Sequence, residues 1–402
     1  MYPTEKHVLV TVAGADAPGI TATLAGIIAN AGAQLRDIEQ VVVQGQLTLC
    51  LAIGVEPGHG HGAPVVKDLL FAAKELGLSL DFEVLGSTPA ARSDATSLYA
   101  VTVIGDEVGA VAVHALTSVL ASFGANIETI KRLSDVTLSS LEFVVAVPRD
   151  PERIQALQTA LVNRALEVGV DLAFQRERLT RRSKRLVVMD MDSTLIRIEV
   201  IDELAREYGV YDQVAAITAR AMQGNMPYEQ SLVERVALLR GMSMDAVLRV
   251  AGNPPVMDGA PELLLALRAL GLKTAVISGG FSIAADALKA RFGLDYAYSN
   301  QLEFKDGKLT GRVLDPIVGP QRKADLLDAL AQREGIPLEQ TVAVGDGAND
   351  LLMIEKAGLG IAFHAKPKLR AAADTSLTQG GLDRILYLLG LRAREVKELL
   401  DG

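Results

Sequence analysis

A short apolar run that ends in two aspartates constrains the fold of this chain more than any other feature. Residues 186–189 are Leu, Val, Val and Met; Asp190 and Asp192 follow one residue apart, and two small hydroxyl residues come next. An uninterrupted apolar run of this kind predicts a strand buried on both faces of a parallel sheet. Ligands of open α/β sheets bind at the carboxyl ends of the strands, so we expect the chemistry of this chain there.

The two aspartates themselves predict a cation site. Carboxylates as close as those of Asp190 and Asp192 repel each other unless a cation lies between them. Oxygen-only ligands suit a hard ion such as Mg²⁺. One carboxylate is then free to attack an electrophile while the other transfers protons.

Length and composition set outer bounds on the class of protein. The 402 residues predict two to four domains, and 49% hydrophobic with 22% charged residues is typical of a globular chain with ample core. The net charge of −9 argues against nucleic acid as a partner. The single Cys50 excludes an internal disulfide, no apolar run approaches the roughly 20 residues needed to cross a bilayer, and no signal-peptide pattern opens the chain. We therefore expect a cytoplasmic protein with no membrane partner.

An internal repeat organises the first part of the chain. Residues 7–85 and 97–178 each show the order strand, helix, strand, strand, helix, strand, which is the ferredoxin-like arrangement. Matching residues recur at a spacing of 92, namely Leu24 with Leu116, Gly32 with Gly124, Ala33 with Ala125 and Ile38 with Ile130. Such a module leaves one sheet face open, which predicts that this face is covered by pairing.

The repeated module resembles the ACT domain, a small amino-acid-sensing unit that usually associates with further copies. In the first module, Asp16 and Gly19 lie in the loop where such domains hold an amino-acid effector, beside a helix N-terminus suited to its carboxylate. The matching loop of the second module, residues 105–109, is one residue shorter and lacks the proline. The resemblance implies a homodimer, amino-acid regulation (by serine, for example), or dimerisation without any ligand; neither the effector nor the sign of its effect follows from the residues.

The domain boundaries follow from this organisation. We expect ACT-like domains over residues 1–90 and 91–180 and a catalytic domain over 181–402. The basic run 176–185 lies at the second boundary, and in an acidic chain we interpret it as a linker.

Three further strand ends after Arg185 carry polar clusters. Strands and helices alternate here, which predicts a doubly wound sheet. Ser278 and Gly279 follow the first apolar strand, ahead of a helix whose N-terminal amides can hold a phosphate. Lys323 opens another helix, and residues 345–350 add two aspartates beyond a further strand.

The four clusters together resemble the haloacid dehalogenase superfamily. Its first motif matches residues 190–194, its second Ser278, its third Lys323 and its fourth residues 345–350. An aspartate at the second acidic position, Asp192, marks the phosphatase branch. The match over most of 185–395 resembles the phosphoserine phosphatase family, which implies hydrolysis of O-phospho-L-serine through an aspartyl-phosphate, the last step of L-serine biosynthesis.

The resemblance also implies a role for each motif residue. Asp190 is the nucleophile and Asp192 the general acid and base. Mg²⁺ is expected on the Asp190 side chain, the Asp192 carbonyl and Asp346, with Asp350 behind them. The substrate's phosphoryl group and remainder are expected on the residues Ser278, Gly279, Lys323 and Asn349.

A helical cap is expected to provide specificity. Residues 200–257, between the first two motifs, are typical of helices that close over a site and exclude water. By resemblance, Glu199 pairs with the substrate ammonium and Arg235 with its carboxylate. Met222 and Tyr228 fall at positions of apolar cover. Whether the resting cap is open or closed does not follow from the sequence.

Two alternative functions remain open at this point. The same chemistry suits another small phosphorylated amino acid or a phosphoprotein. A non-catalytic amino-acid sensor is also conceivable, although all four motifs are intact, whereas loss of Asp190 or Lys323 is the expected mark of such decay.

Overall fold

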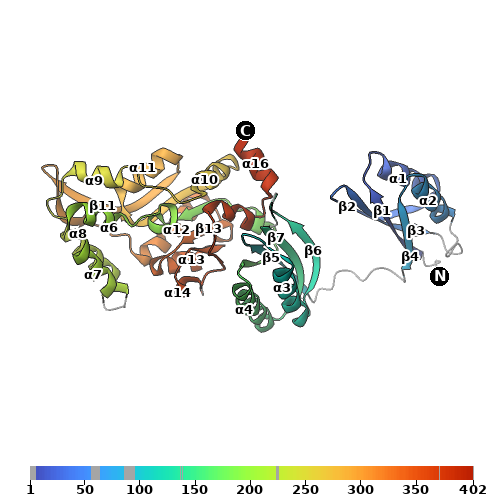
Figure 1. Ribbon diagram of the computed structural model, residues 1–402, viewed down its shortest axis with the longest axis horizontal. Helices are drawn as coiled ribbons and strands as arrows, with labels where there is room; N and C mark the ends of the chain where they lie inside the picture. The colour runs from blue at the N-terminus through green and yellow to red at the C-terminus, as the bar shows by residue number, and fades with distance from the viewer. Residues whose placement is uncertain are drawn as a thin grey trace. The chain divides into compact units, whose positions relative to one another are not determined.

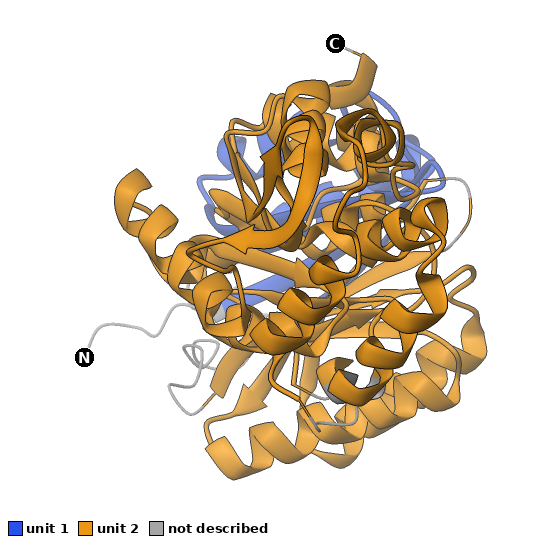
Figure 2. Ribbon diagram, turned by 90° about the vertical axis from the view of Figure 1, so that its left-hand side faces the viewer, with its two compact units in different colours: residues 1–94 blue, residues 95–402 orange. Residues whose placement is uncertain are grey.

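The computed structural model describes residues 6–55, 64–85, 96–135, 137, 139–222, 226–370 and 372–401. The chain divides into two compact units, residues 1–94 and 95–402 (Figure 2).

The first unit has the predicted ferredoxin-like order. Its elements are β1 (Lys6–Ala15), α1 (Ile20–Asn30), β2 (Gln34–Val43), β3 (Gln46–Val55), α2 (Pro64–Glu75) and β4 (Ser79–Leu85). The antiparallel sheet runs β2-β3-β1-β4. Alternate residues of β1 and β3, such as Val10 and Leu49, are buried with the apolar sides of α1 and α2, as the period of two in a half-covered sheet requires.

The second unit opens with the same arrangement, which confirms the repeat. Its elements are β5 (Thr96–Ile104), α3 (Ala110–Ser122), β6 (Asn126–Arg132), β7 (Ser140–Pro148) and α4 (Pro151–Glu167), which Figure 1 labels, followed by β8 (Asp171–Arg176). Its strand order is β6-β7-β5-β8.

This second sheet continues into the sheet of the remaining chain. Together they form one 11-stranded sheet in the order β12-β11-β10-β9-β13-β14-β15-β8-β5-β7-β6. The strands added are β9 (Leu186–Met189), β10 (Lys273–Phe281), β11 (Tyr296–Lys305), β12 (Lys308–Leu314), β13 (Thr341–Gly345), β14 (Gly360–Phe363) and β15 (Thr375–Leu377). Six neighbouring strands of this sheet are parallel, in the order β11-β10-β9-β13-β14-β15, and β12 is antiparallel to β11. The join is antiparallel, with Thr375 of β15 opposite Ala173 of β8.

Helices cover both faces of the parallel part, as a doubly wound sheet requires. Val187 and Met189 of β9 share a core with α10 (Ala260–Ala269) and α11 (Ser282–Phe292). Leu186 and Val188 face the opposite core, with α12 (Pro320–Glu334) and α13 (Leu351–Lys356). Three helices complete the C-terminal part: α14 (Pro367–Arg370), α15 (Ile385–Leu388) and α16 (Ala393–Asp401).

The open face of the second ACT-like sheet is covered by the C-terminal part of the same chain. Ile104 and Ala173 belong to the core that holds α15. The side chain of Gln175 donates to the Leu388 carbonyl at 3.3 Å, and the Ala393 amide donates to the Leu133 carbonyl at 2.8 Å. The pairing expected for this face is therefore made within the unit.

The basic linker is a packed element. Its short helix α5 (Leu179–Arg182) places Arg181, which is 3% exposed, between two glutamates. Arg181 Nη2 lies 2.9 Å from Glu142 of β7, and its Nε lies 2.5 Å from Glu177. The positive charges that we interpreted as a linker therefore fix this segment to β7 of the second module.

The predicted helical cap is present between β9 and α10. It comprises α6 (Val200–Tyr208), α7 (Tyr211–Met222), α8 (Tyr228–Ala237) and α9 (Met244–Ala251). The β11–β12 hairpin, which the sequence pattern did not indicate, pairs with the cap through the Gly241 amide and the Leu309 carbonyl at 2.8 Å. Among the described residues, no helix combines the length and apolar character needed to span a membrane.

Candidate active site

Adjacent parallel strands bring three of the four motifs to one edge. The sheet order β10-β9-β13 makes β9 the central strand. Asp190 follows its last residue, Ser278 lies near the end of β10, and Asp346 directly follows β13. Since parallel strands end on the same side, the sequence motifs converge there as predicted.

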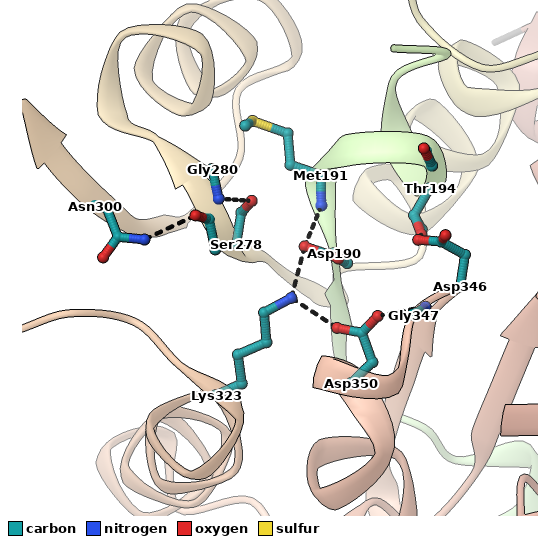
Figure 3. Close-up of polar contacts among 12 residues, drawn as sticks. Asp190, Met191, Thr194, Ser278, Gly280, Asn300, Lys323, Asp346, Gly347 and Asp350 are labelled. Atoms are coloured by element: carbon teal, nitrogen blue, oxygen red, sulfur yellow. Dashed lines mark hydrogen bonds and ion pairs between the residues drawn. The ribbon is translucent and has the colours of Figure 1, made fainter. Parts of the chain in front are cut away.

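Lys323 of α12 joins the cluster from beside the sheet. Its side chain is fully buried, and Nζ lies 2.8 Å from Asp190 Oδ1 and 2.6 Å from Asp350 Oδ1 (Figure 3). Burial alone lowers the pKa of a lysine, but Asp190 and Asp350 outweigh it and raise the pKa of Lys323 above its ordinary value. The ammonium is thus a permanent positive charge against the expected nucleophile.

Three carboxylates lie together beside this ammonium. Oxygen atoms of Asp190, Asp346 and Asp350 lie within 4.8 Å of one another. Burial and the neighbouring carboxylates raise the pKa of Asp346 to about 8 and that of Asp350 to about 7, although Lys323 opposes the rise at Asp350. Thr194 donates to Asp346 Oδ1 at 3.1 Å. Buried acids that resist ionisation together form a site that can hold a metal ion.

Asp192 has a different environment from Asp190. Its Oδ1 accepts the Val200 amide at 3.2 Å, and burial together with the charges of Glu199 and Asp190 raises its pKa well above the ordinary value. Ser193, directly after it, has φ 56°, which turns the chain sharply between the two aspartates and the cap. A carboxyl group that holds its proton is suited to donate it.

The Ser278 turn is fixed by its own hydrogen bonds. The buried Ser278 Oγ accepts the Gly280 amide at 2.8 Å (Figure 3). The Gly279 carbonyl accepts Asn300 Nδ2 at 2.8 Å and the Tyr228 hydroxyl at 3.0 Å. These hydrogen bonds hold the turn in one conformation.

Glu199 and Arg235 lie in the cap segment, as expected. Glu199 precedes α6 and accepts the Ser193 hydroxyl at 2.8 Å. Arg235 of α8 donates to the Ser231 carbonyl at 3.3 Å and to Thr218 Oγ1 at 3.5 Å. Burial raises the pKa of Asp202 above its ordinary value, and the positive charge of Arg235 opposes this rise. The side chain of Met222 lies outside the described residues.

The remaining predicted residues have other positions. Asn349 lies in the turn after β13, and its Oδ1 folds back to within 2.2 Å of where a Cβ on Gly347 would stand. Asp16 and Gly19 belong to the first unit and are exposed. Gly19 caps α1 with φ 96°, a left-handed conformation that favours glycine.

The sequence motifs did not indicate Asn300 or the hydrogen bond that Thr194 donates to Asp346. Asn300 is completely buried in β11 and also accepts the Val318 amide at 2.7 Å. The available signal was an amide side chain in a strand, since a buried amide requires partners.

Comparison with known proteins gives the same class as the fold and site. A model of haloacid dehalogenase-like hydrolases matches residues 184–358, and models of the ACT domain match residues 6–83 and 97–175.

Relatives extend over nearly the whole chain. Phosphoserine phosphatase SerB2 of Mycobacterium tuberculosis is 42% identical over 98% of this chain and 96% of its own length. Phosphoserine phosphatase of Streptomyces coelicolor is 43% identical over 97% and 93%. A crystal structure of a probable phosphoserine phosphatase from Vibrio cholerae, in unliganded form, is 38% identical, covers 77% of this chain and 91% of its own, and has a TM-score of 0.55. This chain belongs to the phosphoserine phosphatase family of the haloacid dehalogenase-like hydrolases.

Proposed function

We propose that this protein hydrolyses O-phospho-L-serine to L-serine and phosphate. The observation that carries the proposal is the cluster of Asp190, Lys323 and Asp350 under the cap, with Asp192, whose pKa is raised, two positions after the nucleophile. The names of the full-length relatives indicate the same substrate.

The metal proposed for the three carboxylates is Mg²⁺. Asp190 and Asp346 would hold it with the carbonyl of Asp192, and Asp350 would support it from behind. The donor set fits, because it consists only of oxygen atoms and its acids ionise with difficulty without a cation. When bound, Mg²⁺ supplies positive charge beside the nucleophile and the phosphoryl group. Removal by EDTA should abolish turnover, Mg²⁺ should restore it, and turnover in EDTA would contradict the assignment.

The protein's own residues account for two successive displacements. The Asp190 carboxylate attacks phosphorus, the ester bond to the serine oxygen breaks, and Asp192 gives that oxygen its proton. Asp192, now ionised, takes a proton from water, the hydroxide oxygen bonds to phosphorus, and the acyl phosphate bond to Asp190 breaks. Ser278, the Gly279 amide and Lys323 bind the phosphoryl oxygens, and positioning with charge neutralisation provides most of the acceleration.

Glu199, Arg235 and Asn349 are proposed to select the substrate. Glu199 would bind the ammonium group and Arg235 the carboxylate of phosphoserine, while Asn349 helps to hold the phosphoryl end. Comparing kcat/KM for phosphoserine, phosphothreonine and a phosphopeptide tests this choice. A phosphopeptide preferred to phosphoserine would favour the phosphoprotein alternative.

The direct test of the mechanism is Asp190→Asn. The amide cannot form the acyl phosphate, so we expect turnover to fall by at least about 10³-fold with the fold retained. Retained phosphate release would exclude Asp190 as the nucleophile. A correctly folded wild-type chain without phosphoserine turnover would exclude the proposed function itself.

The ACT-like region is proposed to dimerise the chain and to bind an amino-acid effector near Asp16 and Gly19. Support comes from the family models and from the exposed loop beside α1. Light scattering of the full chain measures the dimer, and calorimetry with L-serine measures the effector; a monomer or the absence of binding heat would contradict the respective part. The cytoplasmic location remains a prediction.

A further inference from the structure

One carbonyl oxygen in the phosphate-binding turn is held from two sides. Gly279 accepts Asn300 Nδ2 from the sheet and the Tyr228 hydroxyl from cap helix α8, at 2.8 and 3.0 Å. A carbonyl oxygen has two lone pairs, so these donors satisfy it completely. Of these two hydrogen bonds, the one from Tyr228 comes from the cap, so it depends on where the cap lies.

The approach of Tyr228 requires the glycine. A Cβ on Gly279 would stand 1.9 Å from the Tyr228 hydroxyl oxygen, so any side chain there would displace the ring. The next cap residue makes a similar approach, because a Cβ on Gly319 would stand 2.8 Å from Glu229 Oε1. The first turn of α8 therefore rests on two glycines, one in the Ser278 turn and one at the start of α12.

Asn300 connects these two glycine segments beneath the cap. Its Oδ1 accepts the Val318 amide at 2.7 Å, directly before Gly319. The Gly319 carbonyl in turn accepts the amide of Lys323 at 3.0 Å. The hydrogen bond from Tyr228 therefore joins a set of bonds, made by Asn300, Val318 and Gly319, that sets the distance between the Ser278 turn and the Lys323 ammonium.

We propose that the Tyr228 hydroxyl is the latch of the cap and a positioning residue for the phosphate-binding turn. When the cap closes, its hydrogen bond to Gly279 fixes the turn that Asn300 ties to the Lys323 helix. When the cap opens, that bond is lost and the turn keeps one donor. The inference rests on the proposed function for its catalytic consequence, but the closed contact itself does not depend on the substrate.

The test compares Tyr228→Phe with the matched control Tyr208→Phe in the full chain. Tyr208 also donates to a backbone carbonyl, that of Arg240 at 2.8 Å, but in this case donor and acceptor both lie within the cap. With Mg²⁺ present, we expect kcat/KM for phosphoserine to fall roughly 3- to 10-fold in Y228F, the effect of one hydrogen bond, and to stay unchanged in Y208F. Both variants should keep the melting temperature of the wild type within about 2 °C.

Hydrogen exchange without substrate gives a readout independent of activity. Amides of residues 226–232 and 278–281 should exchange roughly 3- to 10-fold faster in Y228F than in Y208F or the wild type. If hydrogen exchange or kcat/KM in Y228F equals that in Y208F, the proposed role of the Tyr228 hydroxyl is wrong. If the wild type fails to hydrolyse phosphoserine, the proposed function is wrong, but hydrogen exchange still tests whether Tyr228 holds the cap against the Ser278 turn.

Discussion

Asp190 and Asp192 are separated by a single residue, but their side chains have different surroundings. Asp190 contacts the Lys323 ammonium and accepts the Met191 amide at 2.7 Å. Asp192 is half-buried and accepts one backbone donor, and desolvation together with the charges of Glu199 and Asp190 raises its pKa. Two carboxyl groups whose environments separate them in this way are suited to different roles, one as nucleophile and one as acid and base.

Asp192→Asn should separate the two chemical steps. An amide cannot protonate the serine oxygen, so we expect phosphoserine turnover to fall roughly 10²- to 10⁴-fold. p-Nitrophenolate needs no proton to leave, so p-nitrophenyl phosphate should still give a rapid burst of about one nitrophenolate per site, followed by slow hydrolysis. Stopped-flow absorbance measures the burst. Equal loss of the first step with both substrates would contradict the acid role of Asp192.

Arg235→Ala should act on the substrate's carboxylate rather than on phosphate. We expect kcat/KM for phosphoserine to fall roughly 10- to 100-fold, the effect of a lost charged hydrogen bond, with a much smaller change for p-nitrophenyl phosphate. Arg220→Ala is the matched control, because Arg220 is an exposed arginine of the cap that pairs with Glu234. A similar loss with both substrates would mean that Arg235 supports the cap instead of binding phosphoserine.

At the scale of elements, glycines decide how closely the strand ends approach one another. A Cβ on Gly280 would stand 2.3 Å from Asp192 Oδ2, and one on Gly345 would stand 2.5 Å from Asp350 Cγ. Each motif glycine thus leaves the space that a neighbouring carboxyl group occupies.

Gly280→Ala should therefore displace Asp192 without unfolding the chain. We expect roughly a 10²-fold loss of kcat, the usual effect of a misplacement near 1 Å. Gly26→Ala in α1 is the control, since nothing lies within 4 Å of its added Cβ and alanine favours a helix. Thermal unfolding and steady-state kinetics check both variants, and full activity in G280A would show that Asp192 tolerates the shift.

The sequence predicted the strand-end residues because parallel strands fix their position. The run before Asp190 forms a buried strand, and the strand that carries Ser278 and the strand that precedes Asp346 pair with it in parallel. Ser278 and Asp346 must therefore lie at the same edge of the sheet as Asp190. Asn300 could not be placed in this way, since its role depends on which carbonyl the β11–β12 hairpin brings opposite it. Tyr228 was expected only as apolar cover, because the hydrogen bond of its hydroxyl group depends on where the cap lies and not on any local sequence pattern.

At the scale of the whole molecule, the two ACT-like modules have different surroundings despite their common fold. The loop of the second module contacts the C-terminal part of the chain, because the exposed Asp106 forms an ion pair with Arg384 at 2.8 Å. Asp171 of β8 accepts the Thr378 hydroxyl at 2.7 Å and the Thr378 amide at 2.8 Å. Side chains without any motif make these contacts, so the repeat alone could not indicate that one module shares its sheet with the catalytic part. The domain boundaries at residues 90 and 180 remain proposals. Because the second module shares its sheet with the catalytic part, the calorimetric test of effector binding uses the full chain and not a truncated chain.

Glu142→Ala tests how strongly this shared unit depends on the buried linker. Glu142 and Arg181 are 1% and 2% exposed in their side chains, and Glu142 also accepts Arg182 Nη2 at 3.0 Å. Removing the carboxylate leaves Arg181 with Glu177 alone, so we expect the free energy of unfolding of residues 95–402 to fall by about 3–5 kcal/mol.

Glu167→Ala is the matched control for that loss, because Glu167 pairs with Arg164 on the surface and both are about half exposed. Its effect should stay within about 0.5 kcal/mol. Urea unfolding of both full-length variants measures the difference, and proteolysis near residues 179–182 should accelerate only in E142A. A loss in E142A as small as that in E167A would mean that sheet continuation through β15 and β8 joins the module to the hydrolase without help from the linker charges.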